Sequence, residues 1–505
     1  MCKVLINWDT YKYNKDKLRE WKLELINLEK ELRDNNYRES FKSEKEIWKL
    51  FSVVLKWINK NDKINSGDDI IYIEILESIF KVIRNANGSL DSNQLNTKEF
   101  VLDEIFITMS KCIELLRKDV TNKQVSTCIQ FGIQCIANSF TGNPYIQNNC
   151  SEALYDSKIF RNIFDFEDDK LQLYTIMTIN NILYNNSTAV DIILKNDNGQ
   201  EILKRIISFA PMFKDDDKFD FIFVIFKNIM NLDKLSLAFN ALAPIQDEEL
   251  GSIAISREQV IFLKFIDAFL EDNKNENDEI VWEYPKDLPD VLAVLFKRVV
   301  SSSYKIISDN KEGNYSTADT DGLILLLIIF GNLVSVLNEE EKIRLSNLGF
   351  VEDLITLLKN ANELQPRLRK LEDKANENST WFMFKSDIIT VISGLAYNCK
   401  HIQDEIRELG GLPLVLANCN IDNNNPYIKE RSVFAIRNLC QNNPENQKII
   451  DSLEAKGVDK STNLDEMGID AEIDENGKLQ IKRIPKKEQK KEQEDNQERI
   501  KVLDE

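Results

Sequence analysis

The sequence predicts an all-α fold, a right-handed solenoid of stacked helical repeats that ends in a small C-terminal β-hairpin. Three observations predict it. The 505-residue chain has only 16 glycines and 10 prolines, which favours long helices over frequent turns. A short motif with an asparagine between apolar residues recurs at about the length of one helical repeat. The chain is also 43% apolar and too long for one compact pair of layers, so it can bury an extended core.

Residues 1–120 show helical periodicity without the recurring asparagine. Near the start, apolar side chains follow one another at spacings of three or four, which places them on one helix face: Leu18, Trp21, Leu25, Leu28 and Leu32. We interpret this region as an N-terminal helical cap with degenerate repeats, because a terminal repeat must present a polar outer side.

Residues 121–384 are predicted to be repeats with polar insertions. The recurring residues, which we call the anchor positions, are Asn138, Asn181, Asn228, Asn332, Gly394 (with Asn398 one turn further on) and Asn438. Their separations are 43, 47, 104, 62 and 44 residues, and three of these match one repeat. The longer gaps contain polar stretches at 271–279, 308–320 and 365–380, which we expect to be loops, and the longest gap should hold one further irregular repeat.

Residues 385–455 contain the clearest repeat. A Gly-Gly pair at 410–411 ends one helix, and the apolar run 412–416 begins a buried one. An Asn-Pro pair at 425–426 begins the next helix, and a second Asn-Pro pair at 443–444 ends it. This order of helices and breaks resembles an armadillo repeat, so the predicted solenoid is of the armadillo/HEAT-like type.

The amino-acid sequence of this repeat points to a more specific family than the order of helices does. The run LVLANCNID followed by NPYIKE and FAIRNL resembles the C-terminal domain of the ataxin-10 family, in its fungal form. The resemblance covers residues 385–484 and is strongest over 409–447. Ataxin-10 proteins are described as non-enzymatic, armadillo-type cytoplasmic proteins that regulate cytokinesis and, in animals, support neuronal survival and neurite growth through partner binding. The resemblance therefore implies a cytoplasmic scaffold or adaptor in cell division.

Residues 456–505 change character. Alternating apolar residues at 469–473 and 479–481 flank Asn476 and Gly477, a pattern typical of a β-hairpin. A lone hairpin is marginal in water, so it either docks on the last repeat or is loosely held. The mixed-charge residues beyond it are expected to be partly disordered.

Net charge, cysteine usage and the N-terminus indicate which classes of partner and which redox environment we expect. With 84 acidic and 65 basic residues the net charge is −19, and such a chain is repelled by phosphate backbones, so we expect no nucleic acid partner. The eight cysteines are scattered and form no C-x-x-C pair, which favours reduced, buried thiols. The N-terminus lacks the apolar core of an export signal.

The most apolar segment, residues 322–337, is shorter than a membrane span. It has 16 residues and includes Asn332 and Ser335, whereas a bilayer needs about 20 apolar residues in succession. We therefore expect a buried helix and no membrane insertion.

The sequence offers little for catalysis. His401 is the only histidine, and no phosphate-binding glycine loop is present. We expect no catalytic residue, no cofactor and no metal site.

One helix, 426–440, carries the best candidate for a protein-binding site. Its predicted buried stripe is Ile428, Ala435, Ile436 and Leu439, and a second stripe is Tyr427, Arg431, Phe434 and Asn438. In armadillo proteins the position of Asn438 lines a concave groove and can bond to the backbone of an extended partner, and the position of Phe434 often holds Trp. We predict that this second stripe binds protein, together with the related positions Asn398 and Asn332. The alternative is that Asn438 bridges neighbouring helices and Phe434 only packs.

The other repeats depart from the peptide-binding pattern. The positions one turn before the other anchors hold no Trp; they are Gln134, Met177, Val224, Ile328 and Thr390. This favours recognition by shape, by loops or by a single terminal patch. Two rival functions stay open, a chaperone or nucleotide-exchange factor for a GTPase and a transport adaptor. The sequence names neither the partner nor the oligomeric state.

Overall fold

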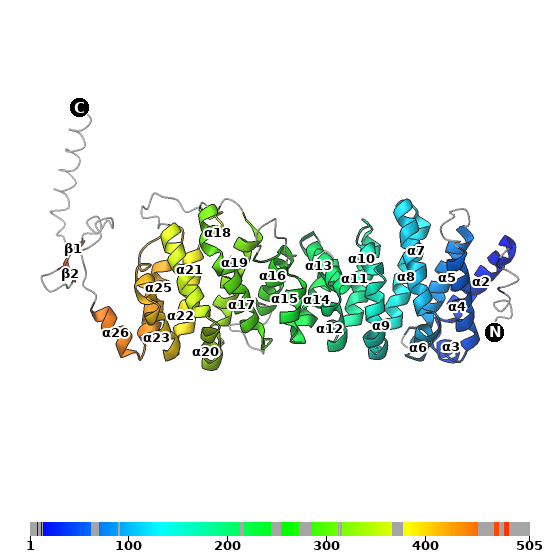
Figure 1. Ribbon diagram of the computed structural model, residues 1–505, viewed down its shortest axis with the longest axis horizontal. Helices are drawn as coiled ribbons and strands as arrows, with labels where there is room; N and C mark the ends of the chain where they lie inside the picture. The colour runs from blue at the N-terminus through cyan, green and yellow to red at the C-terminus, as the bar shows by residue number, and fades with distance from the viewer. Residues whose placement is uncertain are drawn as a thin grey trace, which may run out of the picture. The chain divides into compact units, whose positions relative to one another are not determined.

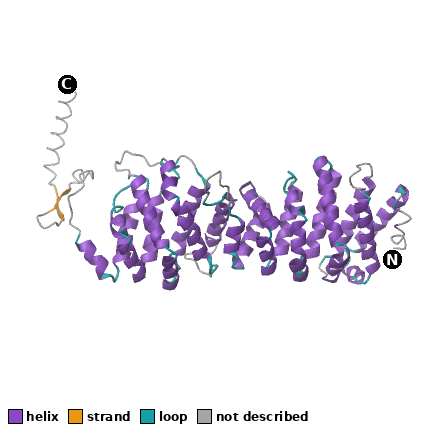
Figure 2. Cartoon of the chain, in the orientation of Figure 1, coloured by secondary structure: helices purple, strands orange, loops and turns teal. Residues whose placement is uncertain are grey.

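The computed structural model describes Trp8, Lys12 and residues 14–61, 70–88, 91–212, 217–243, 254–271, 284–311, 313, 316–365, 377–452, 469–473 and 479–483. By its internal contacts the chain divides into two units. Unit 1 comprises Met1–Asn275 and Val281–Val291, and unit 2 comprises Glu276–Ile280 and Leu292–Glu505. Helices make up nearly all of the described part (Figure 2).

Unit 1 is a stack of helices in which one helix of each repeat packs against its counterpart in the next. The helices are α2 (Lys15–Glu31), α3 (Asn35–Phe41), α4 (Lys45–Lys60), α5 (Ile70–Ala86), α6 (Asp91–Phe100), α7 (Leu102–Lys118), α8 (Lys123–Phe140), α9 (Pro144–Asp156), α10 (Ile159–Ile163), α11 (Asp169–Leu183), α12 (Ser187–Lys195), α13 (Asp197–Phe209), the 3₁₀ turn η2 (Ala210–Met212), α14 (Asp217–Asn231), α15 (Leu235–Ala241) and α16 (Arg257–Glu271). The stacked helices α2, α5, α8, α11, α14 and α16 lie side by side in chain order (Figure 1).

Unit 2 repeats this arrangement. Its helices are α17 (Leu288–Ser301, in this unit from Leu292), α18 (Ser303–Asp309), α19 (Ala318–Leu333), α20 (Glu339–Asn347), α21 (Phe350–Leu364), α22 (Phe384–Ala396), α23 (Lys400–Glu408), α24 (Gly411–Leu416), α25 (Ile428–Cys440) and α26 (Pro444–Asp451). Here α19 packs against α22, and α22 packs against α25. The apolar segment 322–337 falls mainly in α19, whose buried leucines confirm the prediction of a core helix. None of the described helices is long and apolar enough to cross a bilayer.

The anchor positions mark the stacked helices, as predicted. Asn138, Asn181, Asn228 and Asn438 lie in α8, α11, α14 and α25, and each donates its side-chain amide to the preceding stacked helix or the residue that ends it. The acceptors are the Arg84 carbonyl at 2.8 Å, the Thr141 hydroxyl at 3.2 Å, the Leu183 carbonyl at 2.8 Å and the Ser393 carbonyl at 3.1 Å. The bonds of Asn138, Asn228 and Asn438 satisfy polar groups that the stacking removes wholly or partly from water, whereas the bond of Asn181 is exposed.

One anchor was missed. Asn85 in α5 donates to the Glu29 carbonyl of α2 at 3.1 Å, as the other anchors do. Residues 83–86 read Ile-Arg-Asn-Ala, close to the Ile-Arg-Asn-Leu of 436–439, so the signal was present in the sequence. The repeat pattern therefore extends into residues 1–120.

The stacked helices also end in the same way. The second residue beyond each of α8, α11, α14, α22 and α25 has a positive φ; these residues are Gly142, Asn185, Asp233, Asn398 and Asn442. Gly, Asn and Asp adopt this left-handed conformation most readily, which explains why these residue types recur there.

The fold class is all-α, and the prediction that included a C-terminal β-hairpin in it is wrong. Two short strands, β1 (Ile469–Ile473) and β2 (Leu479–Arg483), do pair antiparallel, with Ala471 opposite Ile481. In the described part of the chain the strands make no extensive contact with any helix. Two short neighbouring segments can pair locally, whereas a layer of the fold needs packing against other elements, so the helices alone form the fold.

Several predicted segments lie wholly or largely outside the described residues. They are the stretch 271–279, the centre of 365–380 and the charged end of the chain. Of the stretch 308–320, the ends belong to α18 and α19.

We predict that Asn228→Ala destabilises the chain by about 1 to 3 kcal/mol, the usual cost of leaving buried polar groups unpaired. Asn228 is buried, donates to the Leu183 carbonyl and accepts from the Asn185 N–H at 3.0 Å, so both partners would lose their bond. Chemical denaturation followed by circular dichroism measures the change. The exposed Asn149→Ala serves as the control and should shift the free energy of unfolding by less than about 0.5 kcal/mol. Equal effects of the two substitutions on the free energy of unfolding would contradict the role of Asn228 in joining α14 to α11.

Candidate functional site

The start of α25 is held by a buried polar cluster that the sequence did not reveal. Lys385 at the beginning of α22 forms an ion pair with Asp422, 2.7 Å from Nζ to Oδ2, and both side chains are buried. Asn425 donates to Asp422 at 3.0 Å, and its side-chain oxygen accepts the Lys385 N–H at 2.9 Å. The loop before α25 is therefore fixed against the N-terminus of α22.

The second stripe of α25 is largely exposed at one end. Tyr427, the N-cap residue of α25, is 71% exposed and Phe434 is 53% exposed. Between them Arg431 pairs with Asp387 of α22 at 2.9 Å, which anchors this side chain to the neighbouring repeat. Burial raises the pKa of Asp387 even though the Arg431 guanidinium opposes the rise.

Asn438, at the other end of the stripe, is only 3% exposed. Its side-chain amide donates to the carbonyl and hydroxyl of Ser393, at 3.1 and 3.0 Å, and the backbone carbonyl of Asn438 accepts from the Gln403 side chain at 2.9 Å. Asn438 thus lies in the contact between α22 and α25. This is the alternative that the sequence left open, in which Asn438 bridges neighbouring helices. Its binding role stays a prediction.

The remaining predicted residues lie in other repeats. Asn398 is exposed and forms the left-handed turn after α22, and Asn332 is half-buried in α19. The structure therefore brings Tyr427, Arg431 and Phe434 together on α25 and does not add Asn398 and Asn332 to that stripe.

A further side of α25 is open, and the sequence analysis did not single it out. Ile389, Ile392 and Ala396 on α22 are buried in the stack. Val433, Ile436 and Cys440 stand at the same positions of α25, 44 residues later, yet Val433 is 55% exposed and the other two are half-buried. The other predicted core residues of α25 are all buried; they are Ile428, Ala435 and Leu439. In the described part of the chain, α25 thus presents an apolar edge beside its aromatic stripe.

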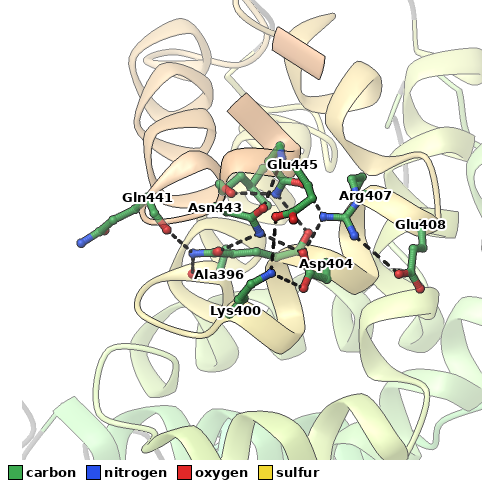
Figure 3. Close-up of polar contacts among 11 residues, drawn as sticks. Ala396, Lys400, Asp404, Arg407, Glu408, Gln441, Asn443 and Glu445 are labelled. Carbon is green, nitrogen blue, oxygen red and sulfur yellow. Dashed lines mark hydrogen bonds and ion pairs between the residues drawn. The ribbon is translucent and has the colours of Figure 1, made fainter. Parts of the chain in front are cut away.

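Hydrogen bonds around Gln403 join the last two repeats, and Figure 3 shows Ala396, Gln441 and Asn443, which take part in them. The Gln403 amide donates to the carbonyls of Ala396, Asn438 and Gln441, at 3.1, 2.9 and 3.3 Å. Asn443, the N-cap of α26, donates to Gln403 at 3.1 Å and to Asp404 at 2.9 Å. The same Gln and N-cap Asn pair recurs in unit 1, where Asn143 donates to Gln94 and Asn186 donates to Gln147.

Asp404 is the most strongly perturbed carboxylate of this network. Burial acts to raise its pKa, but hydrogen bonds from Lys400, Asn443 and Arg407 outweigh that effect and lower the pKa to about 2. The carboxylate is therefore held ionised in the folded chain.

The lone histidine sits in an inter-helix contact. The Ser346 hydroxyl of α20 lies 3.2 Å from His401 Nε2 and donates to Glu405 Oε2 at 2.6 Å. Because the carboxylate binds the serine rather than the imidazole, the three residues do not form the relay in which an acid orients a histidine toward a nucleophile. Among the described residues, no group of three His, Cys, Asp or Glu side chains is arranged to hold a metal ion.

We predict that Asp404→Asn makes stability less dependent on pH in acid. The folded-state pKa of about 2 lies below the unfolded value of about 3.9, so the carboxylate contributes stability that is present above about pH 4 and is lost as the pH falls through about 2. The variant should be less stable than the parent near neutral pH, and the difference should shrink below about pH 4. Urea denaturation at several pH values measures it, with the exposed Asp451→Asn as control. A difference that stays constant with pH would contradict the assignment.

The match to a known family model lies in the C-terminal part of unit 2. Residues 384–482 match the family model described as the spinocerebellar ataxia type 10 protein domain. An ataxin-10 homologue of Dictyostelium discoideum is 49% identical over 110 residues, which is 22% of this chain and 18% of that protein's length. An ataxin-10 homologue of Debaryomyces hansenii is 27% identical over 429 residues, covering 82% of this chain and 81% of that protein. Human ataxin-10 is 23% identical over 417 residues, covering 79% and 80%.

Two solved structures also match a large part of the chain at low TM-score. One is described as Uso1-2, with a TM-score of 0.33, 10% identity and coverage of 86% of this chain and 78% of that one. The other is a designed armadillo repeat protein in complex with peptide (KR)4, with a TM-score of 0.20, 13% identity and coverage of 66% and 99%. The relatives include fungal and vertebrate proteins, and the Debaryomyces hansenii and human proteins match most of the chain. The chain is therefore similar to ataxin-10 proteins over most of its length, and residues 384–482 match the domain that the family model describes.

Proposed function

We propose that this protein is a non-enzymatic scaffold or adaptor that binds partner proteins through α25. The observation that carries the proposal is the exposure of Tyr427 and Phe434 on one helix face, beside the open apolar edge at Val433. Aromatic side chains are the favoured anchors of protein interfaces, because they bury a large area at small cost in conformational entropy.

The surroundings of these side chains suit a specific interface. The ion pair of Lys385 with Asp422 and the bond of Arg431 to Asp387 fix the position of α25 before any partner arrives. A surface held in this way loses little freedom on binding, which favours affinity. The exposed Glu430 and Arg437 flank the aromatic and apolar residues and supply a polar rim.

The resemblance to ataxin-10 proteins supports the finer part of the proposal. Those proteins are described as cytoplasmic regulators of cytokinesis that act through partner binding. We propose that this chain likewise acts in the cytoplasm and regulates cytokinesis. Depletion of the protein should then delay cell separation, and re-expression of the intact chain should restore it.

We predict that Tyr427→Ala with Phe434→Ala reduces partner capture from cell extract by at least about tenfold, because interface aromatics of this kind commonly contribute more than about 1 kcal/mol each. The tagged full chain serves as bait, and quantitative mass spectrometry measures the captured proteins. Tyr304→Ala, which removes an aromatic side chain elsewhere in unit 2 that is 49% exposed, close to Phe434, is the matched control and should leave capture unchanged.

The outcomes separate the scaffold from its rivals. Undiminished capture by the double variant, with thermal unfolding unchanged, would rule out the α25 surface. If the captured partner is a GTPase, timing the release of labelled nucleotide decides between a scaffold, which leaves the rate unchanged, and an exchange factor, which raises it.

A further inference from the structure

The last two stacked helices of unit 2 begin in the same way. The residue before α22 is Met383 and the residue before α25, 44 positions later, is Tyr427; both have a positive φ, and neither side chain caps its own helix. By contrast α8, α11 and α19 are capped by the side chains of their own N-cap residues, which are Asn122, Asp168 and Thr317. The first N–H groups of α22 and α25 must therefore find acceptors outside their own helix.

The loop before α25 supplies these acceptors to α22. The side-chain oxygen of Asn425 accepts the Lys385 N–H at 2.9 Å, and the Asn424 carbonyl accepts the Met383 N–H at 2.9 Å. Asp422, three residues before Asn425, pairs with the Lys385 ammonium group at 2.7 Å. A turn with an acid and an amide three residues apart thus completes the start of α22.

α25 repeats the receiving half of this contact. Lys429 stands 44 positions after Lys385 and is exposed. Among the described residues no carboxylate forms an ion pair with its ammonium group, and no group accepts its backbone N–H. The Tyr427 N–H, the counterpart of the Met383 N–H, also has no acceptor in the described part of the chain. The groups with which α22 holds the next helix are therefore present on α25 and unused.

The open apolar edge of α25 continues the correspondence. Its residues are Val433, Ile436 and Cys440, and their counterparts on α22 are at most 1% exposed. α22 packs more extensively against α25 than against any other helix. A helix that packs on α25 in the same manner would cover the edge and remove its apolar side chains from water.

Two charged residues set the new surface apart from that of α22. Glu430 and Arg437 are exposed and stand where α22 carries the buried serines Ser386 and Ser393. In the existing contact Ser393 bonds to Asn438 of α25. An incoming helix would therefore place the residue at that position beside Arg437, where an acid fits best.

A second folded copy of the chain does not offer the required turn. Its own Asp422 and Asn425 are already engaged with Lys385 of the same copy. The occupant that fits is consequently a helix of a different protein.

We propose that α25 receives a helix of a partner protein in the way that α22 receives α25. The partner helix follows a turn in which an acidic residue stands three positions before an asparagine. The asparagine oxygen caps α25, the acid pairs with Lys429, apolar residues of the helix cover Val433 and Ile436, and a second acid lies beside Arg437. The inference rests on the proposed function of α25 and deepens it, because it names the chemistry of the partner.

A synthetic peptide tests the proposal with the full-length chain. It copies residues 420–441, which hold the turn and α25, with Asn438→Glu so that an acid faces Arg437. It carries a fluorophore, and fluorescence anisotropy measures its affinity. A comparison peptide that also has Asp422→Ala and Asn425→Ala should bind at least about tenfold more weakly, because it lacks both the ion pair and the cap.

Variants of the chain place the binding on α25. Val433→Asp puts a charge in the middle of the open edge and should weaken binding of the peptide by at least about tenfold. Lys429→Glu should also weaken it, and a peptide with Asp422→Lys should recover affinity for that variant, because the ion pair is restored with reversed charges. Tyr304→Ala is the control and should leave the affinity unchanged. Thermal unfolding checks that each variant is folded.

Several results would overturn the proposal. One is the absence of binding up to about 1 mM peptide, as expected if the chain's own end covers the edge. Another is equal affinity for the two peptides. A third is binding that Val433→Asp and Lys429→Glu leave unchanged, since the peptide would then have replaced α25 on α22. An affinity that falls as the chain concentration rises would show that a second copy occupies the edge instead.

The proposed function is tested separately, by partner capture with Tyr427→Ala and Phe434→Ala. If capture depends on these two aromatic residues while the peptide fails, α25 is a binding surface for a partner of another chemistry, and the present inference alone is refuted. If the peptide binds as expected while capture is unaffected, the aromatic stripe is refuted and the helix-receiving edge stands.

Discussion

The structure depends on how each stacked helix satisfies the polar groups that it buries. Stacking removes apolar side chains from water, which drives the association of neighbouring repeats, but it also buries backbone carbonyls, such as those of Leu183 and Ser393. Asparagine side chains meet this need in both units, from Asn85, which donates to Glu29, to Asn438, which donates to Ser393. Gln403 and Asn443 do the same at the ends of the helices. The stack can therefore vary widely in its exposed residues while these positions keep the repeats in register.

The sequence was sufficient to predict what depends on local pattern. The anchor at Asn228 could be found because it recurs at a regular distance, and the helix at 322–337 because its length and polarity exclude a membrane span. The role of Asn438 could not be decided, since an amide bonds equally well to a partner backbone or to a neighbouring helix. The ion pair of Lys385 with Asp422 joins residues 37 positions apart, and no sequence spacing announces such a contact. The hairpin was misjudged for the opposite reason: its pairing is local, whereas membership of the fold depends on packing.

The last repeat shows how position in the stack changes the meaning of a residue. Val433 and Ile389 are both β-branched, apolar residues at the same place in successive helices. Ile389 is core because another repeat covers it, while Val433 is mostly exposed because no described helix does so. A sequence pattern that identifies core positions in the interior of a solenoid therefore identifies candidate binding positions at its end.

The two units use one repeat position for different purposes. Seven residues before the anchor, α22 and α25 carry Asp387 and Arg431, whose ion pair joins the two helices and leaves little surface for a ligand. The same position in α8, α11 and α14 carries aromatic rings that stay partly exposed. An aromatic ring that is half in water loses part of the free energy that full burial would give. The residue at this position therefore differs between the two units, whereas the anchor asparagines bond to the preceding helix in both.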